Sequence, residues 1–239
     1  MTEDIQRILI IADIHGNFEA LKTILEEINH DVIIFLGDMV SFGPDPHLCI
    51  DMLRQENCFL TLMGNHDYAI LDKDRDCKTK WPYKPLSITT REHARRILSE
   101  DQMAWLGNLK ESSSFSLDDY TVYAAHGSPK DPLFGELSAN SSDSQLMAET
   151  EGVKERYILC AHTHAPFIRV LPTGVTIINP GSVGQSADGN NRASCAVIDL
   201  FRSYNQIHRI KYDISKTVQR IKEENLPLEL VSMLEKGGY

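Results

Sequence analysis

The segment that decides how the rest of this chain is interpreted is Ile8-Leu9-Ile10-Ile11-Ala12-Asp13-Ile14-His15-Gly16-Asn17. Its aliphatic run is long enough for one buried strand and too short to cross a membrane. The run ends in a carboxylate, Asp13, and an imidazole, His15, which would point the same way from an extended strand tip. Because open α/β sheets bind ligands at the carboxyl ends of their strands, this pair indicates half of a transition-metal site.

Four more apolar runs end in side chains that can bind a metal. The residues that follow these runs are Asp38, then Asn65 and His66, then His126, and finally His162 and His164. A single histidine after a strand is usually structural, but the same feature at five strand ends favours one shared site. The other histidines follow no apolar run in this way and are interpreted as structural: His30, His47, His93 and His208.

Length and composition limit the possible classes of protein. The 239 residues fit one α/β domain, residues 1–239. The formal charge of −10 counts against binding to a nucleic acid polymer. The five cysteines form no CxxC pair, and neither a signal peptide nor a membrane span is apparent, so we expect a cytoplasmic protein with no membrane partner. The sequence is compatible with a homo-oligomer.

The first half of the chain alternates strands and helices. Apolar runs predict strands at residues 8–12, 32–36 and 58–63, and helical spacing predicts helices at residues 18–28 and around 50–54. This order implies a right-handed, mostly parallel sheet. The charge-dense stretch at residues 72–85 predicts a long loop, either a lid or binding loop or, equally, a solvated excursion.

The second half supplies mainly hairpins, after helices at residues 90–98 and 100–109. A capping box of Ser99 and Gln102 marks the start of the second of these helices. Asp118-Asp119 is expected to be a hairpin turn, and residues 140–151 and 214–223 are expected to be helical. Further strands are expected at residues 115–117, 120–125, 157–160, 167–171, 175–178, 193–199 and 206–212. We therefore expect a second sheet packed on the first, with helices outside both.

The residue types at the strand ends suit a dinuclear metal centre. Two divalent ions about 3.5–4 Å apart can hold a phosphate and a hydroxide together for in-line attack. A shared carboxylate bridges such ions, and neutral imidazoles fill the outer positions. A histidine that is not a ligand can then donate a proton to the leaving oxygen.

Five motifs together resemble the signature of the calcineurin-like metallophosphoesterases, in the family's order and across residues 13–182. They are Asp13-Ile14-His15, Gly37-Asp38, Gly64-Asn65-His66-Asp67, His126 and His162-Thr163-His164. The resemblance implies a four-layer α/β/β/α sandwich with two packed mixed sheets and a metal site at the strand carboxyl ends. It also implies a dinuclear metal-dependent phosphoesterase that acts through attack by a metal-bridging hydroxide.

The resemblance also assigns a role to each motif residue. The first metal would be bound by Asp13, His15 and His164, and the second by Asn65, His126 and His162. Asp38 would bridge the two ions, and His66 would be the catalytic histidine that binds no metal. The ions implied are two divalent transition metals per chain: manganese, iron, zinc or nickel.

Two departures from the family pattern bear on the site. The last motif usually begins with glycine, and Ala161 in its place suggests a slightly different approach to the strand end. In the phosphoprotein phosphatase branch the second motif resembles Gly-Asp-x-Val-Asp-Arg-Gly, whereas this chain reads Gly37-Asp38-Met39-Val40-Ser41-Phe42-Gly43. Because the later aspartate and the arginine are missing, we place the chain in the small bacterial and archaeal phosphodiesterase-like branch.

Four residues outside the motifs are candidates for substrate contact. Asn179, Gly181 and Ser182 follow a strand and offer donors to an anion, although a simple turn is an equal alternative. The Trp81 ring could stack on an aromatic group of a substrate. The favoured partner is a small phosphodiester or nucleotide, and a phosphomonoesterase or phosphoprotein phosphatase remains an alternative. A catalytically silent scaffold is also possible for this fold, but the complete ligand set favours an enzyme.

Overall fold

Two five-stranded sheets pack face to face in the computed structural model, which describes residues 5–117 and 120–238. The order of the first sheet is β10 (Tyr204–Ile210), β9 (Ala193–Asp199), β1 (Arg7–Ile11), β2 (Val32–Phe35) and β3 (Cys58–Thr61). The order of the second sheet is β4 (Ser112–Leu117), β5 (Tyr120–Ala125), β6 (Tyr157–Leu159), β8 (Thr176–Asn179) and β7 (Phe167–Val170).

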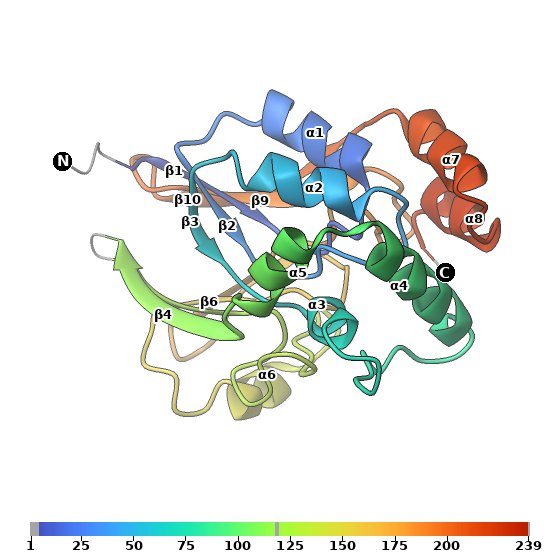
Figure 1. Ribbon diagram of the computed structural model, residues 1–239. Helices are drawn as coiled ribbons and strands as arrows, with labels where there is room; N and C mark the ends of the chain where they lie inside the picture. Colours follow the sequence, from blue (N-terminus) through green and yellow to red (C-terminus); the bar gives the residue numbers. More distant parts are fainter. Residues whose placement is uncertain (1–4, 118–119, 239) are drawn as a thin grey trace.

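Helices cover the outer faces of both sheets (Figure 1). The helices on the side of the first sheet are α1 (Phe18–Glu27), α2 (Pro46–Leu53), α4 (Lys84–Ile97) and α5 (Glu100–Gly107). The short α3 (Asn65–Ile70) lies beside the sheets, and α6 (Asp143–Glu149) lies below the second sheet. The hairpin of α7 (Ile214–Glu223) and α8 (Glu229–Lys236) lies at the end of the molecule where the chain finishes. The fold is the predicted α/β/β/α sandwich with two mixed sheets.

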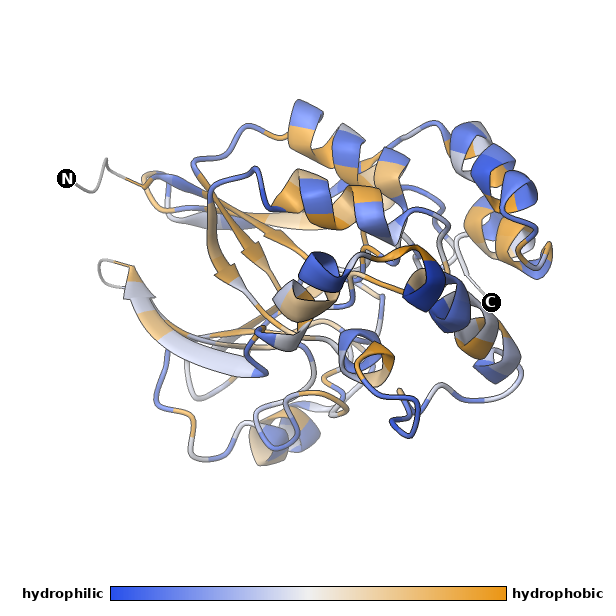
Figure 2. Ribbon diagram, viewed as in Figure 1, coloured by the Kyte–Doolittle hydropathy of each residue, from blue (hydrophilic) through white to orange (hydrophobic). Residues whose placement is uncertain are grey.

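The central strands are apolar along their whole length because both of their faces are buried. Ile8 and Ile10 of β1 face the core between the sheets, whereas Leu9 and Ile11 face the core under the helices. This alternation follows from the two-residue period of a strand, and burial on both faces explains the continuous aliphatic runs. Figure 2 shows the central strands β1 and β2 as hydrophobic, whereas β4 is mostly near neutral and the covering helices alternate between hydrophilic and hydrophobic residues.

Hydrogen-bonded pairing confirms the parallel arrangement at the start of the chain. β1 pairs in parallel with β2, and β2 pairs in parallel with β3. The last hairpin, however, belongs to this first sheet, because β9 pairs antiparallel with β1 and β10 pairs with β9. The carboxyl ends of β1, β2 and β3 therefore meet at one edge, where the polar motif residues follow them.

Two local expectations need correction or lie outside the description, and one helix was not expected. α4 begins at Lys84, so the loop before it is shorter than expected, and Pro85 in the first turn is compatible with helix because its missing N–H needs no partner there. α8 was not expected from the sequence, although its buried Leu230 and Met233 have helical spacing. The expected turn at Asp118-Asp119 lies outside the described residues.

None of the described helices is long and apolar enough to cross a membrane.

Replacing Phe35 by alanine tests whether the core under the helices stabilises the fold. The Phe35 side chain is completely buried, so we expect Phe35→Ala to lower the free energy of unfolding by about 3–5 kcal/mol in urea titrations. The control is Phe201→Ala, whose ring is 79% exposed and whose loss should change stability by less than about 0.5 kcal/mol. Equal effects of the two substitutions would contradict the described core.

Candidate metal centre

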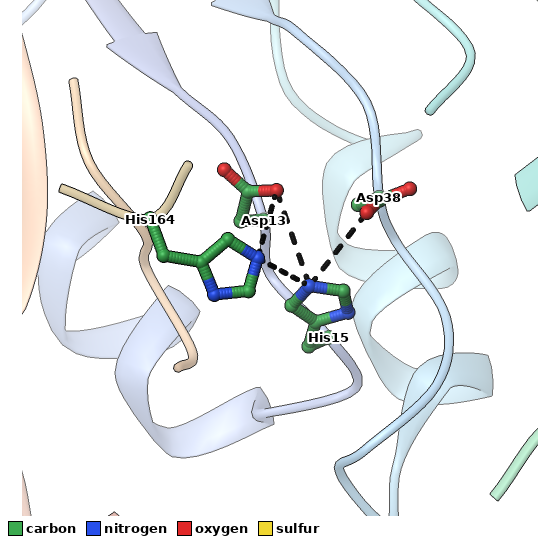
Figure 3. Close-up of side chains that lie close together, drawn as sticks. All are labelled: Asp13, His15, Asp38 and His164. Atoms are coloured by element: carbon green, nitrogen blue, oxygen red, sulfur yellow. Dashed lines mark hydrogen bonds and ion pairs between the residues drawn. The ribbon is translucent and has the colours of Figure 1, made fainter. Parts of the chain in front are cut away.

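Four buried side chains from three segments converge at the carboxyl ends of the strands (Figure 3). Asp13 and His15 follow β1, Asp38 follows β2, and His164 follows β6. Nε2 of His15 lies 3.1 Å from Nε2 of His164, 3.9 Å from Oδ1 of Asp13 and 3.7 Å from Oδ2 of Asp38. Nε2 of His164 lies 3.4 Å from Oδ1 of Asp13. Ligand atoms about 2.1 Å from a zinc ion, at tetrahedral angles, lie about 3.4 Å apart, so these spacings fit a bound cation.

A second group of ligand atoms adjoins the first at Asp38. Oδ1 of Asn65 lies 2.9 Å from Nε2 of His126 and 3.1 Å from Nδ1 of His162, and these two nitrogens are 3.3 Å apart. Nε2 of His126 is 3.4 Å from Oδ2 of Asp38. The same carboxylate oxygen therefore lies near His15 in one group and near His126 in the other. The structure thus brings together all seven residues that the sequence proposed as metal ligands.

Unsatisfied buried oxygens show that these groups fit a cation. Oδ1 and Oδ2 of Asp13 and Oδ2 of Asp38 are buried and have no hydrogen-bond partner among the described residues. A buried carboxylate without a partner is costly, and the usual compensation is a hydrogen-bond donor, an opposite charge or a metal. The described surroundings supply imidazoles and oxygens, which are the ligands that divalent transition metals prefer.

The electrostatics of the protein atoms alone also favour a positive charge here. Burial raises the pKa of the carboxyls, but the nearby imidazoles lower it, and the net shift is downward for both Asp13 and Asp38. Burial lowers the pKa of His126, but Asp38 and Asp13 raise it to about 9. Burial lowers the pKa of His15 to about 3 and that of His162 to about 4, so both rings are in the neutral form that binds metals.

Backbone carbonyls orient three of the imidazoles. Nδ1 of His15 donates to Val40 O at 2.8 Å, Nδ1 of His126 to Leu36 O at 3.0 Å, and Nδ1 of His164 to Gln185 O at 2.6 Å. Each of these bonds leaves Nε2 as the nitrogen that faces the carboxylates. Such bonds fix the tautomer and the ring orientation of a metal-binding histidine, and sequence patterns do not reveal them.

The backbone at the ligands is not extended. This corrects the expectation that Asp13 and His15 lie on an extended strand tip. Asp13, His15, Asp38, His162 and His164 all have φ between 47° and 66°. This left-handed region is unfavourable for residues other than glycine, and residues held in it cluster at functional sites. Asp13 and His15 therefore converge because both lie in a strained loop after β1. Ala161 is not left-handed, and His162 and His164 take up the turn instead, so alanine carries no strain at the start of this motif.

Asn65 and His66 lie in the first turn of α3 and not on a strand end. Successive side chains of a helix diverge, so Asn65 points to His126 and His162 while His66 stands beside the ring of His15 at 5.1 Å between centroids. Gly64 permits this approach, because a Cβ at this position would lie 2.0 Å from Oδ1 of Asp38.

His66 is buried beside the two ligand groups and belongs to neither. Its Nδ1 is buried with no partner in the described structure, and its backbone N–H donates to Oδ1 of Asp38 at 2.8 Å. Burial lowers the pKa of His66, but Asp38 and hydrogen bonding to Cys77 raise it, and the net shift is upward. The position is compatible with the predicted role as a proton donor, which remains a prediction.

Asp67 holds the loop that carries Asp38, a role that the sequence analysis did not assign. Its Oδ2 accepts from the backbone N–H of Asp38 at 2.8 Å and of Gly64 at 3.1 Å. Its Oδ1 accepts from Met39 N at 2.9 Å. The place of Asp67 as the last residue of the third motif was the available signal, but only the fold shows from which N–H groups its carboxylate accepts hydrogen bonds.

The four weaker candidates for substrate contact occupy different surroundings. Asn179 and Ser182 are completely buried, and they bond to the backbone of ligand segments: Asn179 Nδ2 donates to Ala161 O, and Ser182 Oγ donates to Asp13 O. Gly181 is left-handed between them and donates to Asn179 Oδ1. Trp81 is 76% exposed. The hydrogen bonds of Asn179 and Ser182 thus support the segments that carry the metal ligands. Contact of these four candidate residues with a substrate stays a prediction.

The fold and this site define an α/β/β/α protein with a candidate aspartate–histidine metal centre at its strand ends. The family model of the calcineurin-like phosphoesterase superfamily domain matches residues 7–202. An uncharacterized protein of Methanocaldococcus jannaschii is 30% identical over 238 residues, which cover 92% of this chain and 93% of that protein. The chain belongs to the calcineurin-like phosphoesterase superfamily, which supports a hydrolase acting on phosphate esters.

Solved structures agree with this assignment. The crystal structure of a metallophosphoesterase from Sphaerobacter thermophilus has a TM-score of 0.80 at 28% identity and covers 98% of this chain and 99% of its own. A hypothetical protein from Pyrococcus horikoshii has a TM-score of 0.85 at 24% identity, covers 97% of this chain and 98% of its own, and shows the same fold.

Replacing Asp38 by asparagine tests the metal centre. Changes to residues that only orient the metal ligands already weaken metal binding about 10–100-fold, so loss of a ligand charge shared by both groups should weaken it at least about 100-fold. Metal content is measured after chelation, reconstitution and gel filtration. The control is Asp101→Asn, at a carboxylate that is 74% exposed and pairs with Arg54. Wild-type metal content in Asp38→Asn would contradict the site.

Proposed function

We propose that this protein is a dinuclear metal-dependent phosphodiesterase that hydrolyses a small phosphodiester or nucleotide. The observation that carries the dinuclear part is the position of Asp38 Oδ2 between the two ligand groups, 3.7 Å from His15 Nε2 and 3.4 Å from His126 Nε2. Asp13, His15 and His164 would hold one ion, and Asn65, His126 and His162 the other. When bound, such ions supply Lewis-acid charge and lower the pKa of water.

The protein side chains then position and protonate the substrate. Hydrogen bonds of Asp67, Asn179 and Ser182 hold the segments that carry Asp38, His162 and Asp13, so the substrate phosphate would meet a preorganised site. His66 lies beside this centre with an unpartnered Nδ1, the atom from which a proton could pass to the leaving oxygen.

The preference for diesters is supported by Phe42. In the phosphatase branch the sequence pattern has an arginine at this position, where it can grip a terminal phosphate. Here the Phe42 ring lies 5.1 Å from the centroids of both His15 and His66, and the side chain is buried. An apolar ring at this place offers no charge to the extra anionic oxygen of a monoester.

Replacing His66 by alanine tests its proposed role. Loss of a positioned general acid should lower kcat by about 10²–10⁴-fold, while metal content and melting temperature stay at their wild-type values. His208→Ala, on β10, serves as the matched control. A variant that loses metal together with activity would make His66 a ligand and would contradict the assignment.

Turnover of a substrate panel tests the proposed function itself. The protein is reconstituted with manganese, iron, zinc or nickel and assayed with aryl phosphodiesters, phosphomonoesters, cyclic nucleotides, dinucleoside polyphosphates and phosphopeptides. We expect two ions per chain and a larger kcat/KM for diesters or nucleotides than for monoesters. Saturation at one ion would contradict the dinuclear centre, and robust turnover of phosphopeptides without any of diesters or nucleotides would favour a phosphatase.

The same panel tests the exposed Trp81 ring. Stacking contributes about 0.5–1.5 kcal/mol, so Trp81→Ala should raise KM for aryl and nucleotide substrates by about 2–10-fold with little change in kcat. An alkyl phosphodiester is the control substrate and should show no change. An equal increase for the alkyl ester would contradict stacking, and no increase for any substrate would place Trp81 outside the substrate site.

A further inference from the structure

A line of hydroxyl and thiol groups connects α4 to the imidazole of His66. Nε2 of His66 lies 3.4 Å from Oγ1 of Thr79, which lies 3.2 Å from Sγ of Cys77. Sγ of Cys77 in turn lies 3.1 Å from Oγ of Ser87 on α4. Cys77 and Ser87 are buried and Thr79 is half-buried. The segment between α3 and α4 therefore contacts Nε2 of His66 and leaves Nδ1 without a partner among the described residues.

The segment is anchored so that Thr79 has a defined position relative to His66. Nδ2 of Asn65, the residue before His66, donates to Cys77 O at 2.7 Å. Asp76 accepts from Lys78 N and from Nζ of Lys84, each at 3.0 Å. One bond therefore ties the segment to the helix that carries His66, and the others tie it to itself and to α4.

The groups around the sulfur indicate which atoms donate and which accept along this line of hydrogen bonds. Four groups surround Sγ of Cys77: the hydroxyls of Ser87 and Thr79, Nη1 of Arg91 at 3.9 Å, and the ring of His66, which also hydrogen-bonds to the thiol. A guanidinium can only donate, and its charge favours sulfur as an acceptor. With its hydrogen directed to the sulfur, the Thr79 hydroxyl presents a lone pair to His66. Nε2 of His66 then carries a hydrogen and donates it to Thr79.

The second motif offers no carboxylate after Asp38 that could orient His66. Ser41 stands where the phosphatase-branch pattern has its second aspartate, and the Ser41 hydroxyl is buried without a partner among the described residues. Phe42 beside it contributes only a ring contact to His66. Hydrogen bonding to the His66 ring thus comes from the segment before α4.

We propose that the Thr79 hydroxyl, acting beside the Cys77 thiol and backed by Ser87, positions His66. This inference rests on the proposed function, in which the bond between phosphorus and the leaving oxygen breaks and His66 protonates that oxygen. The proton comes from Nδ1 and forms the new O–H bond. The hydrogen at Nε2 stays in its bond to Thr79, so a single neutral tautomer remains.

Three variants separate the hydroxyl from the shape of the side chain. Thr79→Val removes the hydroxyl at nearly constant volume, Thr79→Ser keeps it, and Thr89→Val is the control at an exposed threonine of α4. We expect Thr79→Val to lower kcat about tenfold, the usual worth of one hydrogen bond, with KM unchanged. Thr79→Ser should stay within about twofold of the wild type. The loss should be larger for alkyl than for nitrophenyl esters, because a poor leaving group needs the proton more.

Histidine ¹⁵N spectra give a second readout that needs no turnover. They are recorded on the protein as purified and again after chelation, with the His66 signals assigned from the spectrum of His66→Ala. At a pH where the ring is neutral, the wild type should show its hydrogen on Nε2 of His66, and Thr79→Val should show a mixture of tautomers. Thr79→Ser and Thr89→Val should keep the wild-type pattern.

The outcomes distinguish this inference from the proposed function. Unchanged kcat and an unchanged His66 pattern in Thr79→Val would overturn the positioning role while an active wild type upholds the function. Loss of activity in Thr79→Ser equal to that in Thr79→Val would also overturn it. Activity would then depend on the shape of the Thr79 side chain and not on its hydroxyl. If the wild type hydrolyses no phosphate ester with any metal, the proposed function fails, and the ¹⁵N pattern still decides the contact between Thr79 and His66.

Discussion

The structure of the site depends on the burial of two carboxylates, Asp13 and Asp38, that have oxygens without hydrogen-bond partners among the described residues. Burial of a charge without a partner is among the most costly arrangements in a protein, so the surrounding groups must compensate for it. The imidazoles that crowd around both side chains do so in part, and a cation would do so fully. This single requirement explains why histidines follow so many of the strands.

The ligand loops are strained, and the rest of the fold holds them. Each left-handed residue other than glycine costs on the order of 1–3 kcal/mol, so a short peptide would not keep Asp13, His15 or Asp38 in place. Asp67 and Ser182 satisfy the backbone of these loops, and the cores on both faces of the first sheet fix the strands that precede them. The result is a preorganised set of ligands that need not rearrange to bind a cation.

Phe42 and Thr79 show how one framework can be adapted around the same centre. Phe42 packs an apolar ring against His15 and His66, and it also joins the cluster of Leu230 and Met233 from α8. The helical hairpin at the end of the chain thus supports the residue that distinguishes this second motif from the phosphatase pattern. Thr79 approaches His66 from another segment, the connection between α3 and α4.

The sequence by itself determined the parts of this protein that depend on local chemistry. Periodicity identified the buried strands, helical spacing identified α1 and α7, and the capping box marked the start of α5, because each of these signals lies within a few residues. Motif order indicated the superfamily and the residues that gather at the strand ends. Proline in a first turn concealed the early start of α4, since proline also ends helices.

Only the tertiary structure decided features that depend on residues distant in the chain. Pairing of β9 with β1 joined the last hairpin to the first sheet, and no local pattern encodes which edge a hairpin will choose. The carbonyls that orient His15 and His164, the left-handed loops, and the contact of Thr79 with His66 likewise come from packing. Sequence shows which side chains are available, but their distances and directions follow from the fold, because they are set by contacts between segments that meet only when the chain is folded.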